Sequence, residues 1–166
     1  RAIRHLQKMG HLPSYPLIFR AHTSHNCFIE VRKVAVKILV DIVKTEVRKE
    51  EFDFLLDLID TDPQPAIKFF TLKYLTANPP FSAFKQDHPE GLVHPLDTEE
   101  LVERLWAWMN TQFPCSPKVR CAVTDFYYVL YGRTRPRCLP KIEVSISSNC
   151  FFLSFKLFFH DPGTDW

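Results

Sequence analysis

The feature that most constrains the fold is a helix-opening pattern that occurs three times. An aliphatic residue followed by lysine or arginine opens each copy, at Val31-Arg32, Ile67-Lys68 and Val119-Arg120. A small or β-branched residue follows four positions after the aliphatic one, and large apolar residues follow seven and eight positions after it. This spacing places the apolar residues on one face of an amphipathic helix.

The copies begin 36 and 52 residues apart, and the longer interval contains a proline-rich insertion at 79–96. A helix-pair unit of about 40 residues is the period of HEAT and armadillo repeats. A simple helical bundle gives similar apolar stripes, but the repeated opening favours stacked pairs. We therefore expect an all-α, HEAT/armadillo-like solenoid of five to seven helices with an irregular C-terminal tail.

Apolar periodicity and helix-terminus residues predict where the helices lie. Pro65 and Pro117 suit the first helical position, and Gly132 suits a left-handed C-cap. Asp97 precedes Glu100 by three residues, which is the spacing of a capping box. The five main helices are predicted at 28–44, 50–60, 65–77, 97–109 and 117–131. Shorter helices are predicted at 1–8 and 16–21.

The chain divides into a helical-repeat domain at 1–140 and a tail at 141–166. The tail holds five phenylalanines in the nine residues 151–159. It can be read as a buried strand, a lineage-specific binding segment or translated intron. The first residue is Arg1 and the chain opens inside an amphipathic run, so we expect a fragment of a longer protein.

Composition argues against several kinds of partner. The net charge of +2 gives no global field for nucleic acid or an anionic membrane. No apolar run reaches the length of about 18–20 residues that crosses a bilayer. Five irregularly spaced cysteines do not make a disulfide framework, which favours a reducing compartment.

No motif in the sequence supports catalysis. H-E-x-x-H, G-x-S-x-G, the P-loop and G-x-G-x-x-G are all absent. His22, His25 and Cys27 could ligate a metal, but an interhelical loop explains them better. Cys121 and His88 could form a nucleophile pair, but Cys121 is expected to be a small buried thiol in a packed helix. We predict no catalytic residue, no metal site, no cofactor and no small-molecule ligand.

Contact residues are therefore the candidates for function. A basic cluster follows the last predicted helix and could touch DNA phosphate, although a solvated turn is the simpler reading. Trp106 and Trp108 cannot share a helical face. Of the two, Trp108 is the one expected to be exposed as a partner anchor, and a place in the core or in the lining of a groove stays an equal alternative. The basic cluster consists of Arg133, Arg135, Arg137 and Lys141, and the remaining partner-contact candidates are Arg32, Lys68 and Arg120.

The segments between helices carry a resemblance. In order along the chain they are LQKMGHLP at 6–13, DPQP at 62–65, TANPPF at 76–81 and YGRTRPRCLP at 131–140. Together they resemble the C-terminal helical region of the large aminopeptidase-like TBP-associated factor family of transcription factor TFIID. The likeness covers about residues 6–140, with a longer insertion at 79–96, and fades after Pro140.

The resemblance implies a non-catalytic protein-interaction scaffold in the nucleus that supports RNA polymerase II initiation at core promoters. Its implied partners are other TFIID subunits, including the TATA-binding protein and its associated factors, with promoter DNA and chromatin reached through the complex. No membrane partner is expected. Two alternatives stay open: a helical-repeat adaptor in transport or trafficking, and the C-terminal helical part of an active zinc aminopeptidase.

Overall fold

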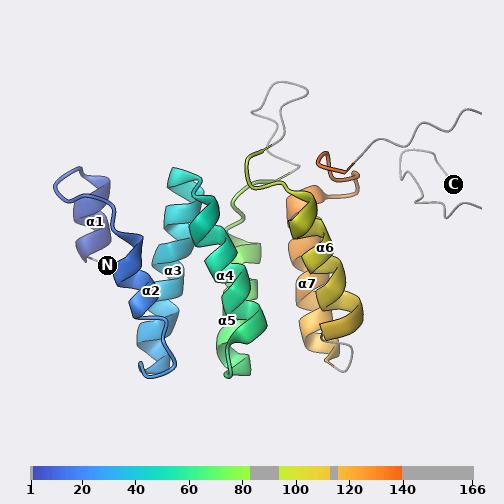
Figure 1. Ribbon diagram of the computed structural model, residues 1–166, viewed down its shortest axis with the longest axis horizontal. Coiled ribbons are helices and arrows are strands. Elements are labelled where there is room, and N and C mark those ends of the chain that lie inside the picture. The colour runs from blue at the N-terminus through green and yellow to red at the C-terminus, as the bar shows by residue number, and fades with distance from the viewer. Residues whose placement is uncertain (1, 83–93, 113–115, 140–166) are drawn as a thin grey trace, which may run out of the picture.

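A computed structural model describes residues 2–82, 94–112 and 116–139 of the chain (Figure 1). Within these residues the chain forms helices and no strand. The tail at 141–166 and most of the insertion lie outside the described residues. The elements are α1 (Ala2–Lys8), α2 (Pro16–Ala21), α3 (Ile29–Glu46), α4 (Lys49–Thr61), α5 (Pro65–Ala77), α6 (Glu99–Ala107), the π-helical turn η1 (Trp108–Gln112) and α7 (Pro117–Tyr131).

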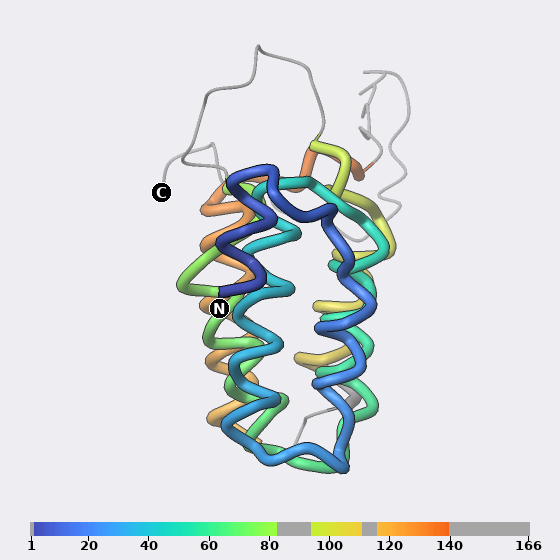
Figure 2. Tube along the Cα trace, turned by 90° about the vertical axis from the view of Figure 1, so that its left-hand side faces the viewer, coloured from blue at the N-terminus to red at the C-terminus, as the bar shows by residue number. Residues whose placement is uncertain are grey.

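The helices stack in two layers (Figures 1 and 2). One layer holds α1, α3, α5 and α7, and the other holds α2, α4 and α6. Within the first layer α5 packs against both α3 and α7, and between the layers α3 packs against α2 and α4. Each helix pair therefore covers the apolar face of the next pair. This is the stacking of a helical-repeat solenoid and confirms the expected all-α architecture.

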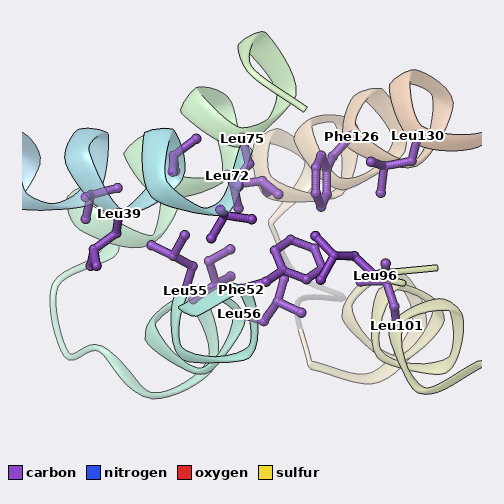
Figure 3. Packing of buried hydrophobic residues seen from close by; sticks show 14 of the residues in the cluster. Leu39, Phe52, Leu55, Leu56, Leu72, Leu75, Leu96, Leu101, Phe126 and Leu130 are labelled. Carbon is purple, nitrogen blue, oxygen red and sulfur yellow. The ribbon is translucent and has the colours of Figure 1, made fainter. Parts of the chain in front are cut away.

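Leucine and phenylalanine side chains from both layers fill the space between them (Figure 3). Burying one such side chain stabilises the fold by about 1.5–3 kcal/mol before entropic costs. The core runs without interruption from α3 to α7, so the described repeats form one body. Its central members are Leu39, Phe52, Leu55, Leu56, Leu72, Leu75, Leu101, Phe126 and Leu130.

Helix ends follow local chemistry. Pro16, Pro65 and Pro117 each open a helix, where the missing N–H is no loss. Gly132 ends α7 with φ of 64°. Val47 ends α3 in the left-handed region with φ of 52°, and its N–H donates to Val43 O at 3.0 Å. A β-branched residue is strained in that conformation.

The predicted cap of α6 is wrong by one residue. Thr98 is the N-cap, and its hydroxyl accepts a hydrogen bond of 3.4 Å from the Leu101 N–H. Asp97 is buried instead and binds a side chain of α7. Tertiary structure directs the Asp97 carboxylate to Tyr131 of α7, and the hydroxyl of the next residue, Thr98, caps the helix.

The three repeated openings do not bury equivalent side chains. Ile67 is fully buried, Val119 is half-buried, and Val31 is exposed. In α3 the following residue, Arg32, faces inward instead. The repeat therefore predicts the helix correctly but not its rotation at the first turn.

None of the described helices has the length and apolar character needed to cross a membrane.

Candidate interaction surface

The basic cluster forms an exposed turn after α7. Arg133, Arg135 and Arg137 are all exposed, and Lys141 lies outside the described residues. Two hydrogen bonds to Tyr131 O hold the start of the turn, one from the Thr134 N–H at 3.2 Å and one from the Thr134 hydroxyl at 2.6 Å. The three guanidinium groups therefore stand on an ordered backbone, and their role in phosphate binding stays a prediction.

The buried carboxylate of Asp97 binds residues at both ends of this turn. The Tyr131 hydroxyl donates to the Asp97 carboxylate at 3.0 Å. Burial raises the pKa of Tyr131 well above its usual range, and Asp97 raises it further. Burial, together with a hydrogen bond to Asp97, also raises the pKa of the Cys138 thiol to about 12. Asp97 thus holds two neutral donors, one on each side of the basic turn.

Arg32 is not a partner contact. Its side chain is fully buried, and it donates to Thr23 O at 2.7 Å and to the Gln64 side-chain oxygen at 2.9 Å. It also pairs with buried Asp62, whose second carboxylate oxygen accepts the Gln64 N–H at 2.8 Å. The guanidinium has several donors and can satisfy all these acceptors at once. The prediction was wrong because loops distant in sequence enclose the charge.

The exposures of Trp106 and Trp108 are the reverse of those expected. Trp108 is fully buried and Trp106 is 61% exposed. The Trp108 indole N–H donates to Asp60 on α4, and Arg104 pairs with the same carboxylate. Asp60 of α4 thereby binds side chains of α6 and η1. Of these two, Trp106 is consequently the one that is open to a partner.

The other contact candidates differ in exposure. Lys68 is half-buried, and its ammonium donates to Asp60 O at 2.7 Å, near the end of α4. Arg120 is exposed near the start of α7 and stays a candidate. Cys121, beside it, is exposed as well, which contradicts the expected buried thiol. His88 lies outside the described residues.

The possible metal ligands belong to a loop at the end of α2. His22 and His25 are exposed and Cys27 is half-buried. No group of three or more histidine, cysteine, aspartate or glutamate side chains among the described residues is arranged to hold a metal ion.

The sequence reading missed a surface on the outer side of the layer that contains α3 and α5. Lys37 lies over the rings of Phe70 and Tyr74, with distances of 5.7 and 5.8 Å from its nitrogen to the ring centroids. The signal was present as Lys33 and Lys37, one helical turn apart, and as the aromatic pair Phe69-Phe70. It could be recognised only once α3 and α5 were known to be neighbours.

Comparison with known proteins agrees with this architecture. Residues 1–152 match the family described as TAF2-like, TPR repeats. That description gives the helical repeats as TPR, a shorter unit than HEAT or armadillo.

Several similar curated proteins bear the name transcription initiation factor TFIID subunit 2. The protein of Drosophila melanogaster is 40% identical over 139 residues, which is 84% of this chain and 11% of the relative. That of Gallus gallus is 38% identical and that of Danio rerio 36% identical, each over 149 residues, 90% of this chain and 12% of the relative. The chain thus spans roughly a ninth of the length of these relatives.

Proposed function

The chain belongs to the TFIID subunit 2 family, and on that premise we propose that it is a non-catalytic scaffold segment of TFIID. In this role it supports RNA polymerase II initiation at core promoters in the nucleus. The observation that carries the proposal is the family match along residues 1–152, together with identities of 36–40% over most of the chain. A continuous two-layer repeat with exposed basic and aromatic side chains suits a contact surface.

Its proposed partners are other TFIID subunits, including the TATA-binding protein and its associated factors. The test is to tag the full-length protein in cells, purify it at moderate salt and identify what accompanies it. We expect the TATA-binding protein and several associated factors. Recovery of transport or trafficking components in their place would overturn the proposal and favour a repeat adaptor of another kind.

The non-catalytic assignment has its own test. An active zinc aminopeptidase needs H-E-x-x-H, and this motif is absent from the present chain. We expect the full-length protein to lack the motif and to release no amino acid from aminoacyl-naphthylamide substrates in the presence of zinc. Zinc-dependent release would show that the segment supports an enzyme.

The basic turn favours an auxiliary contact with promoter DNA. Arg133, Arg135 and Arg137 are exposed together on an ordered turn, where they could neutralise phosphates without reading sequence. Reversing all three charges should weaken binding of the full-length protein to duplex DNA and reduce the dependence of that binding on salt. Unchanged affinity and salt slope would dismiss the contact.

A further inference from the structure

Charged side chains join α1 to α3 and leave a groove between them. The buried Arg4 guanidinium donates to Asp41 at 2.9 Å, to Thr45 at 2.7 Å and to Glu46 at 2.9 Å. Lys8 donates to Asp41 at 2.7 Å. Beside these bonds lies an open groove of about 410 Å³, lined by residues of α1, α3 and α5. Its size falls within the range of roughly 300–1,000 Å³ that is typical of ligand pockets.

The groove has an apolar floor and a cationic rim. Val34, Ile38 and Tyr74 form the floor. The charged lining residues are Arg4, Lys8, Lys37 and Asp41. Arg4 and Lys8 are paired with Asp41, and Arg4 also with Glu46, so Lys37 is the lining lysine that is left without an ion pair. Burial alone would raise the pKa of Asp41, but hydrogen bonds from Lys8 and Arg4 lower it below its ordinary value. Its charge is thus committed to α1 and is not available to Lys37.

The cationic character continues along the outer face of α5 towards α7. Lys118 lies 4.9 Å from the ring centroid of Phe69, and Lys73 lies 5.9 Å from the same ring. Lys73 also pairs with Asp125 at 3.3 Å. Among the described residues, neither Lys37 nor Lys118 makes an ion pair. Lys37 of α3 and Lys118 of α7 are therefore each held over rings of α5, the helix between them, without an anionic partner among the described residues.

We propose that this face binds an acidic, amphipathic segment of a partner protein. An apolar side chain of the segment enters the groove between α1 and α3, and its carboxylates pair with Lys37 and Lys118. The rings beneath the lysines hold the ammonium groups in place, so less side-chain freedom is lost on binding. The apolar floor supplies the anchor contact that a purely ionic surface would lack.

The same contacts disfavour nucleic acid as the occupant. Single strands bind by stacking bases on free aromatic faces. Here Phe70 lies under Lys33 and Lys37, with distances of 5.8 and 5.7 Å to its centroid. Phosphates of a duplex would find cations but would have no use for an apolar floor. An acidic protein segment uses both parts of the surface.

The test measures fluorescence anisotropy of a labelled amphipathic peptide with glutamate on one face and leucine and phenylalanine on the other. The receptor is the full-length protein, with circular dichroism confirming that each variant keeps its helix content. Lys37→Glu should weaken binding by about tenfold or more, because it replaces attraction with repulsion. Lys49→Glu makes the same charge change on α4, in the opposite layer, and should alter affinity by less than about twofold.

A second variant tests the groove without changing charge. Val34→Trp fills the floor and should also weaken binding by about tenfold. If this variant loses helix content, the comparison of Lys37→Glu with Lys49→Glu tests the proposal by itself.

Absence of binding, or equal losses for Lys37→Glu and Lys49→Glu, would overturn the proposal. If duplex DNA displaces the peptide and binds the Val34→Trp variant as tightly as the unaltered protein, the face binds nucleic-acid phosphates and the proposal of a protein partner is wrong. The inference stands on these contacts and not on membership of TFIID, so failure of the co-purification experiment would leave it intact.

Discussion

The hydroxyl of Tyr131, the last residue of α7, donates a 3.0 Å hydrogen bond to the buried carboxylate of Asp97, just before α6. This bond joins two helix ends that are 34 residues apart in the chain. Cys138 contacts the same carboxylate from the far side of the basic turn. The exposed arginines of that turn are therefore positioned by a buried polar cluster, not by their own backbone alone.

The thiol of Cys138 should be chemically quiet. Its pKa is raised to about 12 by burial and by Asp97, and the thiolate is the reactive form. In iodoacetamide labelling at pH 8, followed by peptide mass spectrometry, Cys138 should react at least about tenfold more slowly than exposed Cys121. Asp97→Asn should narrow the difference. Equal labelling rates would show that the cluster does not form in solution.

Removing the buried guanidinium should be one of the costliest single changes. Arg32→Ala leaves the carboxylate of Asp62 buried without its partner, and we expect a loss of about 3–5 kcal/mol in the free energy of unfolding. Lys33→Ala, the next residue, removes an ion pair to exposed Glu30 and should cost less than about 1 kcal/mol. Urea denaturation measures both, and similar losses would contradict the buried role of Arg32.

The two tryptophans provide a matched pair. Trp108→Ala opens a cavity in the core and removes a donor to Asp60, so it should cost about 3–5 kcal/mol. Trp106→Ala should change stability by no more than about 0.5 kcal/mol, because the side chain is mostly in solvent. Thermal unfolding that ranks the two variants in the opposite order would refute the placement of Trp108 in the core and of Trp106 at the surface.

Val47 offers a stabilising change. Its left-handed backbone costs a β-branched residue about 1–2 kcal/mol, and glycine relieves this at a smaller entropic loss. Val47→Gly should therefore raise the free energy of unfolding by about 0.5–1 kcal/mol. Val31→Gly, the same substitution within the first turns of α3, should lower it instead. If both variants are destabilised, the strain at Val47 is absent.

The attachment of α1 should depend on pH. Bonds from Lys8 and Arg4 outweigh burial and lower the pKa of Asp41 below 3.8. Such a group contributes stability that is present above the unfolded-state pKa and is lost as the pH falls through the folded-state value. Thermal midpoints should drop on acidification below about pH 4, and Asp41→Asn should flatten that drop.

Asp53 provides the control of opposite sign. Burial raises the pKa of Asp53, so its protonation at low pH favours the folded state. Because Asp53→Asn removes this contribution, the thermal midpoint of that variant should fall more steeply as the pH is lowered. If Asp41→Asn and Asp53→Asn shift the pH profile in the same direction, the assigned ionic environment of α1 is incorrect.

The positions of the helices could be read from the sequence because the signals are local. The opening prolines and the apolar spacing placed α2, α5 and α7 almost to the residue. The linker motifs pointed to the family because four of them occur in the same order along the chain. The use of Thr98 as the cap of α6 escaped prediction, because two adjacent residues could serve and tertiary contacts chose between them.

Only the tertiary structure decided which of the charged and aromatic side chains are buried and which are exposed. The sequence alone determined an amphipathic helical repeat and the approximate extent of its helices, which depend mainly on residues within one or two turns. Whether Arg32 or Trp108 meets solvent depends on loops and helices that are about 30 to 48 residues away in the chain. The lysine and aromatic face exists only because α3, α5 and α7 lie side by side, and no local pattern carries that information.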